Sequence, residues 1–243
     1  MRDKTAAIIV IGNEILSGKV VDTNAAFLTQ ELRGLGVTLQ RILVIPDDVE
    51  IIADAVRDYQ PRFDVVFTSG GVGPTHDDVT MEGVARGLGR QVIRHPVLET
   101  KIREWSGDRI NDARLKLAEV PEGTELVFEG NLPFPTILVE NLYILPGIPE
   151  IFREKFLAIK ARFAVDPYFL RVVYTRAMES AIAEHLNATL AAFPQVQIGS
   201  YPKLSDPEYR VRLTLESKDE ATVNRAFEDL VGRLPADIIV RTE

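Results

Sequence analysis

The sequence of 243 residues contains no cysteine, which excludes disulfide bonds, thiolate metal ligands and cysteine nucleophiles. It also has no apolar run that approaches the roughly 20 residues needed to cross a bilayer. Residues 1–5 lead directly into a strand-like segment, without the apolar stretch and cleavage site of a signal peptide. These absences predict a cytoplasmic protein that has no contact with a membrane.

Positive charge is also scarce, since 28 Lys and Arg stand against 36 Asp and Glu, which gives a net charge of −8. Proteins that bind nucleic acid need a basic face to replace the counterions around the phosphates. The sequence has no Lys/Arg cluster of that kind, so we expect no nucleic-acid partner. An acidic protein that handles phosphates usually uses backbone amides and a bound cation.

Strand-like and helix-like segments alternate through the first two thirds of the chain. The predicted strands cover residues 6–11, 37–45, 65–67, 136–140 and 142–145, and the predicted helices cover residues 22–35, 49–59, 79–88, 96–105 and 149–163. Residues 91–135 are otherwise less regular. This alternation predicts an α/β domain of three layers, with a mostly parallel sheet covered on both faces.

The pattern changes after residues 164–167, where we place a boundary between a first domain (1–165) and a second domain (166–243). The second domain is predicted to have strands at 169–175, 196–201, 209–215 and 238–240 and helices at 180–193 and 219–234. The order β-α-β-β-α-β predicts a small ferredoxin-like α+β domain.

The strongest candidate for chemistry is the glycine-rich segment 69–80, SGGVGPTHDDVT, which follows a buried strand and opens a helix. Glycines let the backbone approach a ligand closely, and a helix start offers unpaired N–H groups to an anion. The segment is neither a P-loop nor a Rossmann fingerprint. The competing interpretation is a tight turn in which Asp77 or Asp78 is an N-cap. The predicted phosphate contacts here are Ser69, Gly70, Gly71, Gly73, Pro74, Thr75 and Thr80.

Three other strand-to-helix turns are rich in small and polar residues. Because the carboxyl ends of parallel strands share one edge of a sheet, we expect all four turns to form one site. Asp22 or Thr23 is also a candidate N-cap, and Asp47 and Asp48 carry the same ambiguity. The predicted contacts in these turns are Gly12, Asn13, Glu14, Asp22, Asn24, Asp47, Pro146 and Gly147.

A carboxylate pair repels phosphate, so the two fit together only if a cation lies between them or a carboxylate activates water. Mg²⁺ typically takes one or two carboxylates together with ligand phosphates. We therefore predict Asp47, Asp77 and Asp78 as metal ligands, and Asp78 with Asp47 as the catalytic residues.

The segment 69–80, together with Gly12-Asn13-Glu14 and Leu145-Pro146-Gly147, resembles the MoaB/Mog family of molybdopterin-binding domains. Within that family the likeness is greatest to the N-terminal domain of the competence/damage-inducible protein CinA and to the molybdopterin-binding-like domain of eukaryotic FAD synthases. The resemblance extends into the second domain through residues 179–182, 199–202 and 209–215.

The resemblance implies roles for two aspartates, because residues matching Asp47 and Asp78 are important for adenylyl transfer to molybdopterin in Mog-type enzymes. Similar domains in the CinA and FAD-synthase relatives are associated with metal-dependent hydrolysis of ADP-ribose or FAD. The chain ends at Glu243, so we expect neither the amidohydrolase domain of CinA nor the adenylyltransferase domain of FAD synthase.

These observations lead us to predict a metal-dependent nucleotide pyrophosphatase that cleaves a dinucleotide diphosphate such as ADP-ribose or FAD and releases AMP. The expected metal is magnesium or cobalt, and potassium and molybdopterin are further candidate cofactors. The alternatives are molybdopterin binding with adenylyl transfer, and a ligand-binding or scaffold protein without turnover. We also expect a homo-oligomer, a dimer or a trimer, with the second domain in the subunit contacts and residues 199–202 as a loop near a ligand or partner.

Overall fold

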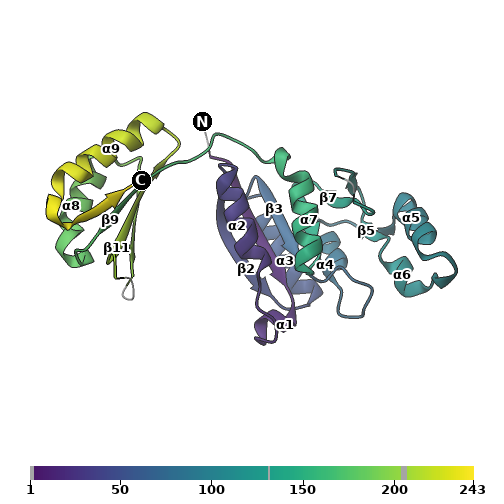
Figure 1. Cartoon of the computed structure of the whole chain (residues 1–243). Helices are drawn as coiled ribbons and strands as arrows, with labels where there is room; N and C mark the ends of the chain where they lie inside the picture. The colour runs from purple at the N-terminus through teal and green to yellow at the C-terminus, as the bar shows by residue number, and fades with distance from the viewer. Residues whose placement is uncertain (1–2, 131, 204–206) are drawn as a thin grey trace. The chain divides into compact units, whose positions relative to one another are not determined.

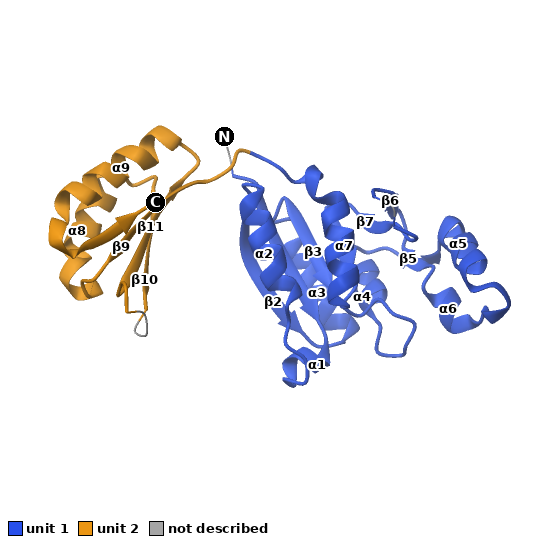
Figure 2. Cartoon of the chain, viewed as in Figure 1, with its two compact units in different colours: residues 1–165 blue, residues 166–243 orange. Residues whose placement is uncertain are grey.

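The computed structural model describes residues 3–130, 132–203 and 207–243. It divides into two compact units, residues 1–165 and residues 166–243 (Figure 2). Within the described part of the chain, no helix is both long enough and apolar enough to span a bilayer.

Unit 1 is built on a six-stranded sheet with the strand order β2-β1-β3-β8-β7-β6 (Figure 1). Its strands are β1 (Thr5–Ile11), β2 (Thr38–Ile45), β3 (Val65–Ser69), β6 (Glu125–Val127), β7 (Thr136–Val139) and β8 (Leu142–Leu145). Strands β2, β1, β3 and β8 are parallel to one another, and β7 runs antiparallel to both of its neighbours. The carboxyl ends of the four parallel strands therefore lie along one edge.

Helices cover both faces of this sheet. Helices α2 (Asn24–Gly34) and α7 (Pro149–Ile159) pack on one face, and α3 (Val49–Tyr59) and α4 (Thr80–Gly87) pack on the other. Successive side chains of β1 point to opposite faces, so Ile8 joins the first cluster and Ile9 the second. Each buried aliphatic side chain of this kind contributes about 1.5–3 kcal/mol. The predicted three-layer α/β fold is confirmed.

Residues 88–124 add a small lobe beside α4. Strands β4 (Val92–Arg94) and β5 (Glu119–Pro121) pair antiparallel, and α5 (Pro96–Ser106) and α6 (Asp112–Lys116) lie between them in the chain. Leu98, Ile102, Ala118 and Val120 form the buried centre of the lobe. The helix predicted over 96–105 is confirmed, whereas the sequence patterns missed the two three-residue strands. The single-turn helix α1 (Asn13–Leu16) follows β1 directly.

Unit 2 is a four-stranded antiparallel sheet with the order β10-β11-β9-β12. Its elements are β9 (Phe169–Thr175), α8 (Glu179–Ala192), β10 (Gln197–Pro202), β11 (Val211–Ser217), α9 (Glu220–Arg233) and β12 (Ile239–Thr242). Val173, Leu213 and Leu215 of the sheet form one cluster with Ile182 of α8 and Leu230 of α9. The predicted ferredoxin-like arrangement is confirmed.

The strand predicted at residues 196–201 is confirmed as β10, and the loop predicted at residues 199–202 is wrong, because these residues are the last four of that strand. Gly199 pairs with Thr214 and Pro202 with Val211 of the neighbouring strand. Strand β10 lies at the edge of its sheet, where a proline is tolerated because only one side of the strand needs its N–H groups.

We expect a Gly70→Ala substitution to destabilise unit 1. Gly70 has a φ of +106°, and a Cβ at this position would lie 2.1 Å from the backbone oxygen of Ile11. The backbone at the ends of β1 and β3 must therefore move, at a cost of at least about 1 kcal/mol. The check is the urea midpoint of unfolding, with Gly34→Ala as control, since nothing lies within 4 Å of a Cβ there and Ala favours a helix. Equal midpoints for the two variants would contradict this account.

We also expect residues 1–165 to fold without unit 2. The clusters on both faces of the six-stranded sheet and in the small lobe consist of residues from unit 1. Trp105, the one tryptophan of the chain, lies in the same unit and reports on its packing through near-ultraviolet circular dichroism. A truncated chain whose Trp105 signal is lost at room temperature would refute the independence of unit 1.

Candidate functional site

The four predicted turns lie together at the carboxyl edge of the parallel strands, at the end of the sheet where α1 lies (Figure 1). The N–H of Gly12, after β1, donates to the oxygen of Ile45 at the end of β2 at 3.1 Å. The N–H of Gly70, after β3, donates to the oxygen of Leu145 at the end of β8 at 3.2 Å. The structure thus brings together residues from positions 12 to 147 of the sequence.

Asn24 ties two of these turns together from the start of α2. Its Nδ2 donates to Ser69 Oγ at 2.9 Å and to the backbone oxygen of Gly147 at 2.9 Å. Asn24 is buried, and its Oδ1 has no hydrogen-bond partner among the described residues. It lines a small hollow of about 60 Å³ together with Glu14 and Gly70. A buried acceptor of this kind is normally satisfied by water or a ligand.

The glycine-rich loop adopts a backbone that glycine permits and other residues resist. Gly70 and Gly71 both have left-handed φ values, +106° and +62°. A Cβ on Gly71 would lie 2.3 Å from Thr80 Oγ1. Thr80 is fully buried, and its Oγ1 donates to the oxygen of Gly70 at 2.9 Å while its N–H donates to the oxygen of Gly71 at 3.0 Å. The loop is therefore held against the first turn of α4.

Asp78 closes the outer part of this loop. Its Oδ2 accepts the N–H of Thr75 at 2.8 Å and also the Thr75 hydroxyl. Val79 precedes α4 and the described structure shows no side-chain cap there, so the N-cap interpretation of Asp77 and Asp78 is wrong. Pro74 is an exposed residue of the same loop.

Asp77 lies on the exposed side of the loop, next to His76, whose Nδ1 is 3.9 Å from Asp77 Oδ1. The neighbouring Thr75 hydroxyl lowers the pKa of the Asp77 carboxyl from its usual value, and the backbone N–H of Asp77, His76 and Lys116 act in the same direction. The Asp77 carboxyl is therefore ionised at neutral pH.

The glycine-rich loop faces a cavity of about 560 Å³, which we call the loop hollow. Gly71, Gly73 and Asp78 line it, as do three cationic side chains. These cations are Arg86 of α4, Arg90, and Lys116 of α6, whose Nζ donates to the oxygen of Thr75 at 2.5 Å. The sequence analysis missed all three. Arg86 lies on the helix that the loop opens, which was a usable signal, whereas nothing in the sequence connects Lys116 with a loop some 40 residues earlier.

The remaining predicted residues divide between structural and exposed positions. Asp48, rather than Asp47, caps α3, with its Oδ1 accepting from Glu50 and Ile51 at 2.9 and 3.0 Å. Asp47 is therefore not the cap, and its Oδ2 accepts the N–H of Asn13 at 2.8 Å. The carboxylate of Asp22 accepts the N–H groups at the start of α2, which makes it the structural cap anticipated as the alternative. Pro146 is partly buried beside these turns.

The three predicted metal ligands do not form a ready-made metal cage. In the part of the chain that the structure describes, no three His, Asp or Glu side chains are grouped to hold a metal ion. Of the three aspartates, Asp78 lines the loop hollow, and Asp47 and Asp77 lie outside it. Mg²⁺ fits such a site only when a bound phosphate supplies several of its oxygens, which is its usual mode of binding with substrates.

Two family models match this chain, and the boundary between them agrees with the boundary between the two structural units. Residues 7–164 match the family model "Probable molybdopterin binding domain", and residues 167–243 match "FAD synthase, middle domain". A protein of Archaeoglobus fulgidus is 38% identical over 93% of this chain and 97% of its own length. The "Probable FAD synthase" of Caenorhabditis elegans is 34% identical over 97% of this chain, which spans about half (51%) of that protein.

A solved structure supports the same assignment. The protein CinA of Thermoplasma acidophilum, described as of unknown function, superposes with a TM-score of 0.61 and is 32% identical. The match covers 66% of this chain and 98% of that one. The chain therefore belongs to the family of molybdopterin-binding domains of the MoaB/Mog type, in the form that continues into an FAD synthase middle domain.

Proposed function

We propose that this protein is a metal-dependent nucleotide pyrophosphatase that cleaves a dinucleotide diphosphate such as ADP-ribose or FAD and releases AMP. The observation that carries the proposal is the wall of the loop hollow. It combines the left-handed backbone of Gly71 with three carboxylates, among them Asp78 of the loop, and three cations, all within one cavity. The likeness to FAD synthases supports an enzyme that acts on nucleotides.

The glycine-rich loop is the place for the diphosphate. Gly71 and Gly73 line the hollow, and because they have no side chain, Thr80 and Asp78 pack against the loop where a Cβ would otherwise stand. Lys116 and Arg86 line the same hollow and offset part of the negative charge. A divalent cation, when bound, polarises a phosphoryl oxygen and so makes the phosphorus more electrophilic.

Asp78 is the residue that we assign to the cation and the attacking water. Both hydrogen bonds from Thr75 use Oδ2, so Oδ1 is the oxygen available to a cation or to water. The oxygen of water forms a bond to one phosphorus, the anhydride P–O bond breaks, and the second phosphate leaves with the bridging oxygen. The proton released by water passes to Asp78 or to solvent. The products are AMP and a second monophosphate.

Adenylyl transfer to molybdopterin is the second candidate function. The match of residues 7–164 to a probable molybdopterin binding domain favours it. It uses the same anion site, and the acceptor distinguishes the two reactions: water takes the adenylyl group in hydrolysis, and molybdopterin takes it in transfer. A protein that binds ligand without turnover is the outcome if neither reaction is found.

The first prediction from this proposal concerns the metal. Pure protein incubated with ADP-ribose or FAD releases AMP in the presence of Mg²⁺ or Co²⁺, because a divalent cation offsets the repulsion between the diphosphate and the carboxylates that line the loop hollow. Chromatography of the products measures the release, with and without potassium. Excess EDTA abolishes it, and full turnover in EDTA would rule the metal out. Formation of adenylylated molybdopterin without free AMP, when molybdopterin is added, would favour the second candidate.

The second prediction separates the two adjacent aspartates. Asp78→Asn lowers kcat by about 100-fold or more, because it removes the charge that faces the cation or water. Asp77→Asn is the matched control, since Asp77 lies outside the loop hollow, and it changes kcat by less than about threefold. Thermal unfolding of both variants checks that the loss is not one of folding, since the Thr75 bonds contribute about 1 kcal/mol each. Equal losses in the two variants would contradict the assignment of Asp78.

A further inference from the structure

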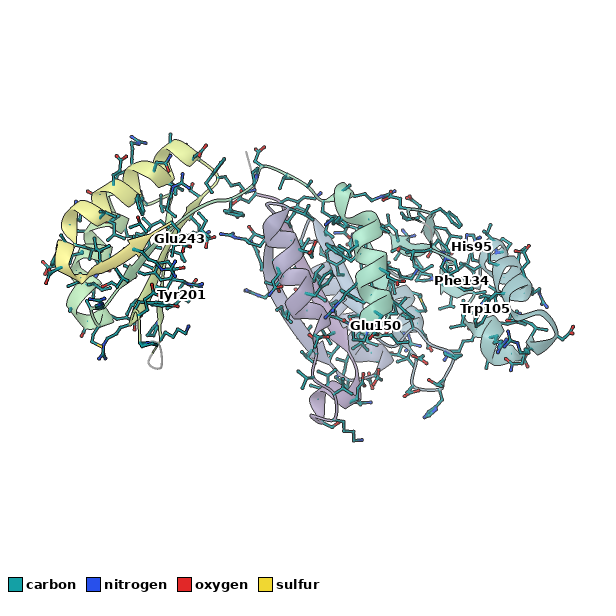
Figure 3. The ribbon with its side chains drawn as sticks, in the orientation of Figure 1. His95, Trp105, Phe134, Glu150, Tyr201 and Glu243 are labelled. Carbon is teal, nitrogen blue, oxygen red and sulfur yellow. The ribbon has the colours of Figure 1, made fainter. Side chains whose placement is uncertain are left out.

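A second, apolar cavity of about 210 Å³ lies next to the loop hollow, and we call it the aromatic hollow. Trp105 of α5 and Phe134, in the segment before β7, form part of its wall. Their rings meet edge to face with centroids 5.8 Å apart (Figure 3). Ile151 and Lys155 of α7 form another part. The cavity therefore lies among the small lobe, α7 and the segment that leads into β7.

The two hollows share walls. Val72, Met81 and Leu117 line both of them. Val72 stands between Gly71 and Gly73 in the glycine-rich loop, so a residue of the proposed phosphate site also borders the aromatic hollow. Pro146, which follows β8 at the same edge of the sheet, also lines the aromatic hollow. One ligand with a charged part and an apolar part can occupy both.

The aromatic hollow leaves large apolar side chains in contact with water. Trp105 is 53% exposed and Ile151 is 40% exposed. The guanidinium of Arg114 lies 5.1 Å from the centroid of the Trp105 ring, which holds that ring in place by a cation–π contact. A second planar ring that packs edge to face or offset against Trp105 makes a favourable aromatic contact and removes the exposed tryptophan surface from water.

Lys155 supplies a polar group inside this apolar wall. Its Nζ donates to the oxygens of Phe134 and Pro135 at 3.0 and 2.6 Å. An ammonium group has three donors, so a third N–H remains after these two bonds. Burial lowers the pKa of Lys155 to about 8, and the group therefore stays mainly protonated at neutral pH. A ligand with an acceptor at its edge gives this third donor a partner.

We propose that the aromatic hollow binds the planar heteroaromatic ring of the ligand whose phosphates lie on the glycine-rich loop, with an acceptor on the ring edge facing Lys155 Nζ. The identity of the ligand as a nucleotide rests on the proposed function. A flavin and an adenine ring share the chemistry that this hollow recognises, and the experiment distinguishes them.

The test uses riboflavin and adenosine, two ring compounds without phosphate, and the full-length protein. Because Trp105 is the one tryptophan in the chain, its fluorescence reports directly on the hollow. We expect at least one compound to quench it saturably after correction for absorbed light, and the stronger of the two identifies the ring. Equilibrium dialysis of the same compounds gives a second, independent measure of binding.

Two glutamate variants on α7 locate the binding. Ile151→Glu places a charge in the wall of the hollow and raises the Kd by about tenfold or more. Leu157→Glu is the matched control, because Leu157 is similarly exposed (44%) on the same helix but does not line the hollow. Its Kd changes by less than about twofold. Should Ile151→Glu fail to fold, Phe134→Leu, which removes a ring and keeps an apolar side chain, is expected to weaken binding in dialysis.

Two results would overturn the proposal. One is the absence of saturable binding of both compounds up to about 1 mM. The other is equal weakening, or none, in Ile151→Glu and Leu157→Glu, which would place the ring elsewhere. Neither riboflavin nor adenosine has an anhydride to cleave. Loss of ring binding in a protein that still releases AMP therefore counts against the aromatic hollow alone, and ring binding without AMP release counts against the pyrophosphatase alone.

Discussion

The amide of Asn24 joins three parts of the chain that lie far apart in the sequence: the start of α2, the end of β3 and the turn after β8. Its two donated hydrogen bonds fix the turns after β3 and β8 to the start of α2, next to the point where Gly70 lies against the backbone of Ile11. With that edge fixed, the glycine-rich loop has one path toward α4, and Thr80 fastens it there. The orientation of Asp78 and the shape of both hollows depend on this path.

The elements predicted well from sequence are those whose burial leaves a strong pattern. Strand β1 is buried along its whole length and is a continuous apolar run, and α3 begins and ends where its spacing predicts. Strands β4 and β5 leave no such pattern, because each has three residues and β4 is exposed along its length. Residues 199–202 overlap the strand predicted at 196–201 but were also predicted as a loop, because Gly199 and Pro202 are turn-forming residues. Such residues also occur in an edge strand, where pairing depends on the backbone.

Prediction of the functional site from the sequence has a different limit. Sequence position identifies the turns at the carboxyl ends of strands, but it does not say which aspartate in a turn is a cap. Asp22 and Asp48 accept N–H groups at the start of the helix that follows each of them, whereas Asp47 accepts the N–H of Asn13 from another turn and Asp78 accepts the N–H of Thr75 in its own loop. The distinction depends on φ, ψ and the direction of one side chain, which single-sequence patterns do not contain. The same is true of Lys116, which reaches the loop from a separate lobe.

The charges around the loop hollow explain why a cation is needed under the proposed function. Arg86 is engaged by Glu50 and Glu82, and Arg90 by Glu140, so much of their charge is already offset. A diphosphate that enters the hollow also meets the carboxylates of Asp78, Glu82 and Glu119. Under that proposal these carboxylates weaken binding of the phosphates alone, and a divalent cation between the phosphates and Asp78 would change repulsion into attraction. The apolar ring contributes affinity that does not depend on charge, so the two hollows together favour a ligand that carries both parts over inorganic phosphate or a free base.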